Sequence, residues 1–171
     1  QDLSYKTVAI GTTDQGTYTT ANIINSRSKI HWSSKNIRLE DALNDLRMDK
    51  IDAFVVVSAA PIEKLNLNPQ VIGDKLALIT LENFNDWAKD YKADTIRTTD
   101  YKWLDHDIPT FSVRSVLVVN DSKLNESERA SIRQLQMGIQ GKLEQLKAEG
   151  HPKWQEINLM DWNEKDWPIY R

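Results

Sequence analysis

The first half of the chain alternates short apolar runs with stretches whose apolar residues recur at helical spacing. Runs at 6–10, 53–57 and 76–81 are rich in β-branched or aliphatic residues, as the buried strands of a parallel sheet are. Helical spacing predicts one helix over about 17–28 and a second over 39–48. The alternation of the two patterns indicates an α/β fold with a mostly parallel sheet.

Weaker patterns predict further elements along the chain. They are a short strand at 29–32, a short helix at 62–67 that follows Pro61, a helix at 83–92, a return strand at 110–119 and a long helix at 125–150. The long helix begins with Asn125 and, three residues on, Glu128, which is the pattern of a capping box.

These elements suggest three consecutive segments in a single compact domain. Residues 1–93 form the α/β unit, 94–124 form a crossover segment with a strand, and 125–171 form a C-terminal helix and a tail. The tail is expected to dock on the domain, with a juxtamembrane stretch as the alternative, because Trp and Tyr favour membrane interfaces. Its aromatic residues are Trp154, Trp162, Trp167 and Tyr170.

Composition narrows the class of protein. The 171 residues include 22 Lys and Arg against 25 Asp and Glu, a balance that argues against nucleic acid as the partner. The chain has no cysteine, which excludes a disulfide framework and a thiolate site and is compatible with the cytosol or a periplasm. No apolar run approaches the ~20 residues that span a bilayer. Because no signal peptide is present and the chain begins with Gln1, we expect a trimmed or excised soluble domain.

Residues 11–17, between the first strand and the first helix, are the main candidate for a binding site. The free backbone N–H groups at a helix N-terminus favour an anion or a carboxylate. The threonine hydroxyls and the glutamine amide of this loop add further polar groups. The alternative is a purely structural turn, in which Asp14 or Thr13 caps the helix.

The two glycines of this loop, Gly11 and Gly16, have the spacing of a phosphate-binding P-loop. That motif continues with Lys and then Ser or Thr, whereas this chain continues with Thr17 and Tyr18. A nucleotide site is therefore not expected here.

The rest of the chain carries weaker chemistry. No histidine pair has metal-binding spacing and no serine lies in a GxSxG elbow, so we expect neither a metal nor a cofactor. The one hint of an enzyme is the triplet Asp105, His106 and Asp107. An enzyme is the third hypothesis, after the binding protein and the interaction module described below. Tyr101 and Trp103 precede a strand, where they either wall a pocket or pack over the sheet edge.

Four segments, in this order, resemble the TAXI-type solute receptors of TRAP transporters. TVAIGTTDQGTYTTA at 7–21 is similar to the family's "vGxxxSGTxxTA". The sequence at 43–61, with KIDAF and SAAP, is similar to "AL..GkiDAff…gaP". DIPT and the strand after it, at 107–119, look like "dvpTvav.a.Lvv", and the final GHP at 150–152 matches "…l...hp".

The resemblance implies a type 2 periplasmic-binding-protein fold of two α/β lobes, in which about 6–93 form the second lobe. Half of the first lobe is absent, so the chain is expected to be an excised piece or a shortened relative. A small acidic solute, such as an amino acid or another carboxylate, would bind in the interlobe cleft. TRAP membrane subunits or a fused membrane segment are the implied partners.

Two departures from the family pattern affect the expected ligand. Gln15 stands where the family has Ser, and Asp14 before it repels a carboxylate. The family's "gtY.g" segment is replaced at 99–103. We therefore expect a ligand that differs from the family's usual one, a ligand that is zwitterionic or cationic, or the loss of ligand binding.

We expect a non-catalytic solute-binding protein or sensor domain that lies in the periplasm or elsewhere outside the cytoplasm. A membrane anchor in the full-length protein is one option. The alternative is a protein-interaction or homodimerisation module without a small ligand, because half a receptor exposes the face that its missing half covers. The expected ligand contacts come from the loop, from the joint after the strand at 53–57 and from an aromatic wall: Thr13, Asp14, Gln15, Gly16, Thr17, Ala59, Ala60, Tyr101 and Trp103.

Overall fold

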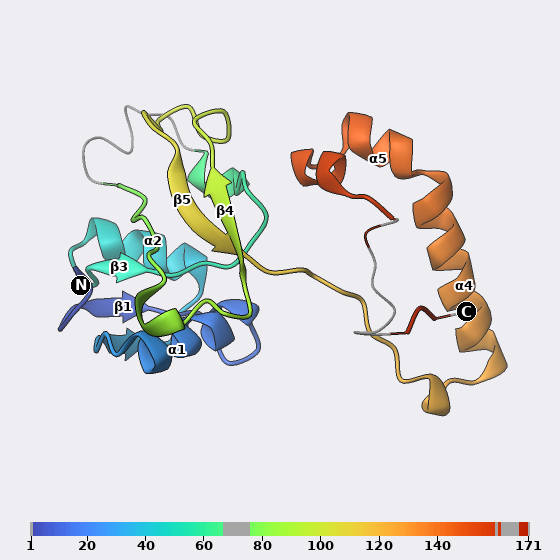
Figure 1. Ribbon diagram of the computed structural model, residues 1–171, viewed down its shortest axis with the longest axis horizontal. Coiled ribbons are helices and arrows are strands. Elements are labelled where there is room, and N and C mark those ends of the chain that lie inside the picture. Colours follow the sequence, from blue (N-terminus) through green and yellow to red (C-terminus); the bar gives the residue numbers. More distant parts are fainter. Residues whose placement is uncertain (1, 67–75, 160, 162–167, 171) are drawn as a thin grey trace. The chain divides into compact units, whose positions relative to one another are not determined.

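The computed structural model describes residues 2–66, 76–159, 161 and 168–170. The chain divides into two compact units, Gln1–Val113 and Arg114–Arg171 (Figure 1). The crossover segment expected over 94–124 is therefore divided between the two units. Each unit is described by itself below.

A small parallel sheet organises the first unit. Its strands β1 (Thr7–Ala9), β2 (Ser33–Lys35) and β3 (Ala53–Phe54) lie in the order β2-β1-β3. In this register Val8 lies beside Ser34 on one side and Ala53 on the other. With its helices this sheet makes the unit α/β, as the sequence pattern predicts.

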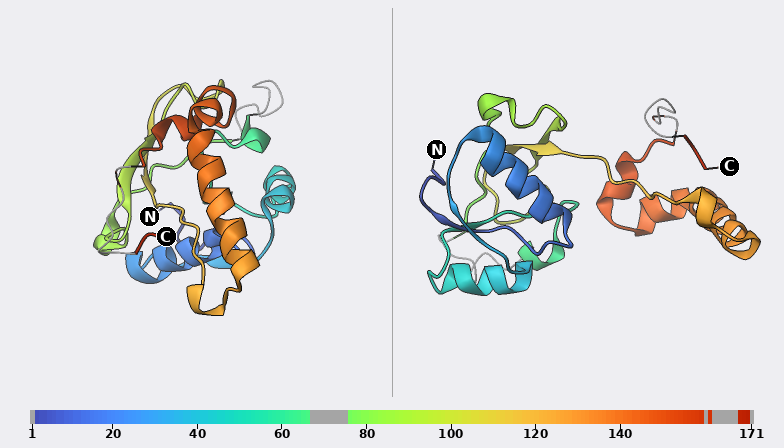
Figure 2. Two further views of the ribbon diagram at one scale, coloured as in Figure 1. Left: turned by 90° about the vertical axis from the view of Figure 1, so that its right-hand side faces the viewer. Right: turned by 90° about the horizontal axis from the view of Figure 1, so that it is seen from below.

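The alternating side chains of the central strand form two small cores, one on each face of the sheet. Helix α1 (Gly16–Ser28) packs Ala21 and Ile24 against Val8, which is completely buried. Helix α2 (Leu39–Arg47) packs Ala42 against Ala9. The two helices therefore lie on opposite faces of the sheet (Figure 2). Burial of each large apolar side chain contributes about 1.5–3 kcal/mol to this packing.

An antiparallel hairpin completes the first unit. Strands β4 (Lys92–Ile96) and β5 (Ile108–Ser112) pair with Ile96 opposite Ile108 (Figure 1). Trp87 is buried and packs edge-on against Phe111, with 5.1 Å between the ring centroids. The hairpin is thereby tied to the core under α1.

The prediction of a strand at 29–32 is wrong, because the strand that pairs with β1 begins only at Ser33. Helix α1 ends at Ser28, and its C-cap residue Lys29 has a φ of 59°, in the left-handed region. Trp32 is buried in the core and donates its indole N–H to Ser34 Oγ at 3.1 Å. Strand β3 is also shorter than the predicted 53–57, although Val55 N still donates to Ala9 O.

Two predictions between residues 62 and 92 are wrong, and a third element is shorter than predicted. The run at 76–81 forms no strand and is only partly buried, since Ile79 is 46% exposed while Leu81 packs against the core beside Val8. In place of the helix predicted at 83–92 the chain forms a single 3₁₀ turn, η3 (Phe84–Asp86), because Asn85 and Asp86 have positive φ angles of 52° and 56°, and Lys92 is already part of β4. The short helix expected at 62–67 is the 3₁₀ turn η1 (Glu63–Leu65), and residue 67 lies outside the described residues.

Strand β5 ends at Ser112, so the strand predicted over 110–119 is cut short. The chain continues without regular structure, and large apolar residues along it are 45–75% exposed: Val113, Val116, Leu117 and Val118.

The second unit contains the long helix predicted over 125–150, but in two parts. These are α4 (Glu126–Gly141) and α5 (Leu143–Glu149), separated at Lys142. The capping box is confirmed, because Asn125 Oδ1 accepts from Glu128 N at 2.9 Å and Glu128 Oε2 accepts from Asn125 N at 2.8 Å. The turns η4 (Asp121–Lys123) and η5 (Pro152–Glu156) flank the helices, whereas Trp162 and Trp167 lie outside the described residues.

Candidate functional site

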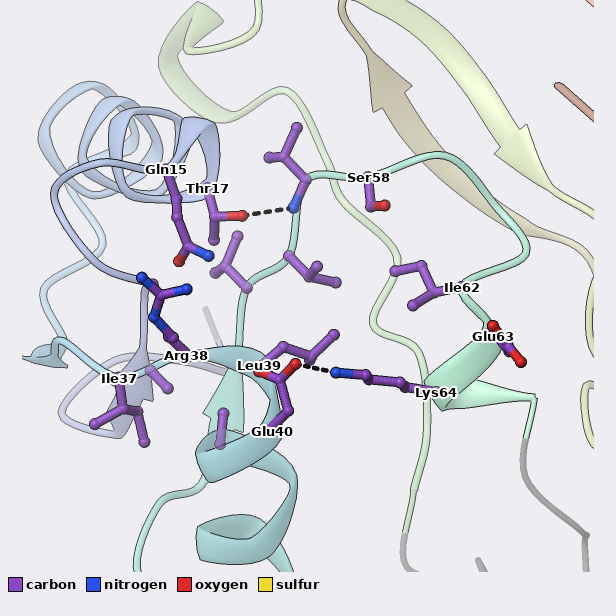
Figure 3. Close-up of a pocket in the computed structure, with 16 residues that line it drawn as sticks. Gln15, Thr17, Ile37, Arg38, Leu39, Glu40, Ser58, Ile62, Glu63 and Lys64 are labelled. Carbon is purple, nitrogen blue, oxygen red and sulfur yellow. Dashed lines mark hydrogen bonds and ion pairs between the residues drawn. The ribbon is translucent and has the colours of Figure 1, made fainter. Parts of the chain in front are cut away.

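A pocket of about 410 Å³ lies in the first unit at the edge where the parallel strands end (Figure 3). Segments that follow all three strands line it, as ligand sites of parallel α/β sheets do. They are the loop after β1, the start of α2, the residues after β3 and the turn η1. The lining residues are Ala9, Gly11, Gln15, Thr17, Ile37, Arg38, Leu39, Glu40, Ala42, Val55, Val56, Val57, Ser58, Ile62, Glu63 and Lys64.

The loop after β1 is closed by its own side chains. Gly11 has a φ of 76°, and Gln15 Oε1 accepts a hydrogen bond from Thr12 N at 3.0 Å. Asp14 is engaged as well, because its Oδ1 accepts from Thr12 Oγ1 at 2.5 Å. The N-cap residue of α1 is Gln15, with no side-chain cap among the described residues, so the capping turn built on Asp14 or Thr13 is wrong.

Thr17 connects the first turn of α1 to the chain after β3. It is buried, and its Oγ1 accepts a hydrogen bond from Val57 N at 2.9 Å (Figure 3). A hydroxyl has one donor and two acceptor positions, so its proton is still available to a ligand oxygen. Thr17 is therefore both a structural contact and a lining residue.

Two ion pairs lie at the rim of the pocket. Arg38 Nη2 lies 3.5 Å from Asp14 Oδ2, and Lys64 of η1 pairs with Glu40 of α2 (Figure 3). The pKa of Asp14 lies below its ordinary value because of the Thr12 hydroxyl first and Arg38 to a lesser degree. The hydrogen bond from Lys64 likewise lowers the pKa of Glu40. Both carboxyl groups are therefore ionised at neutral pH.

Tyr101 and Trp103 support the pocket from outside it. Tyr101 is buried, and its hydroxyl accepts from Ile62 N at 2.8 Å. Trp103 donates its indole N–H to Leu65 O at 2.7 Å, and the two rings lie 5.3 Å apart. Burial raises the pKa of the Tyr101 hydroxyl. The two aromatic residues therefore hold the turn η1 in place and are not among the residues that line this pocket.

Of the nine residues predicted to contact a ligand, Gln15 and Thr17 line the pocket. Thr13, Asp14, Gly16, Ala59 and Ala60 lie near it in sequence but not in its lining, as far as the described residues show. The sequence analysis missed the charged residues Arg38, Glu40 and Lys64. The sequence offers one signal that could have identified two of them as site residues: Arg38 and Glu40 lie at the start of a predicted helix that follows a strand.

The Asp105–His106–Asp107 triplet forms a local surface contact. His106 Nδ1 lies 2.5 Å from Asp105 Oδ1, and the side chains are 70% and 87% exposed. Asp107 Oδ1 instead accepts a hydrogen bond from Thr98 N at 2.8 Å. Across the described residues, His, Asp and Glu side chains form no group of three or more that could hold a metal ion.

No protein-family model matches the chain, and neither the curated proteins nor the solved structures include a significant match. In the part of the chain that the structure describes, no helix is both long and apolar enough to cross a membrane. Function is therefore inferred from the pocket and its residues.

Proposed function

We propose that the first unit is a non-catalytic solute-binding or sensor domain that holds a small carboxylate or an amino-acid-like ligand. The observation that carries the proposal is the pocket at the carboxyl ends of the parallel strands, with Arg38 and Lys64 on its rim. Its volume falls in the range of small-molecule sites, about 300–1,000 Å³. Its two cations, Arg38 and Lys64, suit a carboxylate, and the guanidinium of Arg38 can bind it through two parallel hydrogen bonds.

The sheet order and the sequence motifs support a more specific form of the proposal. The order β2-β1-β3, with helices on both faces, agrees with one lobe of a type 2 periplasmic-binding protein. The loop and SAAP segments that resemble TAXI-type receptors flank the same pocket. On this proposal the protein acts outside the cytoplasm, with TRAP membrane subunits or a fused membrane segment as its partner.

The proposal is tested by calorimetry of the chain against amino acids and dicarboxylates. A ligand is expected, and Arg38→Ala should weaken its binding roughly tenfold, as the loss of a charged hydrogen bond does. Arg47→Ala is the matched control, because Arg47 lies at the other end of the same helix and should leave binding unchanged. Failure of every solute to bind, or equal effects of the two variants, would contradict the proposal.

A second candidate is an interaction or homodimerisation module. The exposed apolar residues Val113, Val116, Leu117 and Val118 favour it, because a run of this kind on a chain surface suits a protein contact. Light scattering over a range of protein concentrations tests it. Dimers that persist in Leu117→Asp, or a strict monomer, would count against this surface.

A further inference from the structure

The rim of the pocket carries charges of alternating sign. Asp14 pairs with Arg38 in one ion pair, and Glu40 pairs with Lys64 in the other. In Figure 3 the Arg38 side chain points toward Gln15, whereas the Glu40 carboxylate points toward Lys64. In chain order these four charges are negative, positive, negative and positive, and Glu63 adds a further negative charge to the lining.

Each inner member of this row can accept one more partner. All four side chains are more than half exposed, so packing does not seal either pair. The guanidinium of Arg38 has five N–H donors. Asp14 Oδ2 contacts only one of its nitrogens, Nη2, at 3.5 Å, so other donors can bind a ligand. A carboxylate offers about four acceptor positions, so Glu40 can serve Lys64 and a second cation together.

Resting on the proposed solute site, we propose that the ligand is an α-amino acid with an apolar side chain. Its carboxylate binds Arg38 and its ammonium binds Glu40, which continues the alternation of charge along the rim. Val55, Val57 and Ile62 line the same pocket and give the side chain an apolar surface. This narrows the wider class of small carboxylates to one kind of zwitterion.

Charge balance separates this ligand from its competitors. A dicarboxylate places a second negative group beside Glu40, and a simple amine places a positive group beside Arg38. Like charges at close range disfavour binding, whereas a zwitterion leaves the net charge of the rim unchanged.

Calorimetry with alanine, valine and leucine tests the inference on the whole chain. At least one of these amino acids should bind. Analogues that lack its ammonium or its carboxylate should bind at least roughly tenfold more weakly. For leucine these analogues are 4-methylpentanoate, which lacks the ammonium, and 3-methylbutylamine, which lacks the carboxylate. Glutarate serves as the dicarboxylate.

Variants identify the group that reads the ammonium. Glu40→Gln should weaken binding of the amino acid but not of its des-amino analogue, whereas Asp41→Asn, outside the lining, should change neither. Equal affinity for the amino acid and its des-amino analogue or glutarate overturns the inference and leaves the solute site standing. Binding of none of these probes also overturns it, and the wider screen above then decides whether the pocket takes any solute.

Discussion

Gly11 closes the turn that starts the pocket. Its φ of 76° lies in the left-handed region, and a Cβ there would lie 2.8 Å from Gln15 Oε1 and 3.2 Å from the Thr17 side chain. Gly11→Ala should therefore lower the free energy of unfolding by about 1–3 kcal/mol, measured by urea denaturation.

The second glycine of this loop is a matched control for the first. Gly16 begins α1, and a Cβ there meets no described atom within 4 Å. Gly16→Ala should leave stability unchanged or raise it slightly, since alanine restricts the unfolded chain. Equal losses in the two variants would show that the turn at Gly11 is not the cause.

At the residue scale, the sequence identified only the part of the site that is local in the chain. Gln15 and Thr17 were found because they follow a strand and open a helix. Lys64 comes from a turn 24 residues beyond Glu40, and the fold alone brings them together. Tyr101 and Trp103 were noticed as aromatic residues, but only their hydrogen bonds to the backbone of η1 reveal a supporting role.

At the element scale, η1 depends on residues far along the chain. Tyr101→Phe removes the acceptor for Ile62 N and leaves the ring in place. An unpaired N–H that is fully buried costs about 1–3 kcal/mol, and because this one is only partly buried the free energy of unfolding should fall by that amount or less. Ligand affinity should fall as well, because Ile62, Glu63 and Lys64 of this segment line the pocket.

The exposed Tyr5 provides the control for this substitution. Its side chain is 94% exposed, so Tyr5→Phe should alter neither unfolding nor binding. If Tyr101→Phe behaves like Tyr5→Phe, η1 is held by other contacts, and the support assigned to Tyr101 is wrong.

Elements with strong periodicity were predictable and elements fixed by side-chain hydrogen bonds were not. The helices at 17–28 and 39–48 and the central strand follow from apolar spacing, and the structure confirms them. The segment 83–92 has helical spacing, yet Asn83 and Asn85 bond to Ala88 N and Ser28 O and hold it in turns. The apolar run at 76–81 shows that composition alone does not supply a strand partner.

At the scale of the whole molecule, two carboxylates connect elements of the first unit and make its stability depend on pH. Asp52 Oδ2 accepts from Thr7 N at 2.8 Å, and Asp45 pairs with Lys35 at 2.6 Å. These contacts lower the pKa of both carboxyl groups in the folded chain. Their contribution is therefore present above the unfolded pKa of about 3.9 and is lost as the pH falls through the lower folded pKa.

The expected result is a loss of stability in acid to which these two groups contribute. Urea unfolding followed from about pH 6 to pH 2 should show the midpoint falling below about pH 4. Asp52→Asn should be less stable at neutral pH and should show a shallower fall in acid. Asp2→Asn, which also removes one carboxyl group, should keep the original pH profile.

The central claim is that the pocket at the carboxyl ends of β1, β2 and β3 binds a small solute. NMR of the uniformly ¹⁵N-labelled chain, titrated with the amino acid that binds in calorimetry, tests it most directly. We expect the largest amide shifts at 11–17, 37–42 and 55–58, and at the same solute concentration these shifts should be clearly smaller in Arg38→Ala. Largest shifts in the second unit, or shifts that persist unchanged in Arg38→Ala, would contradict it.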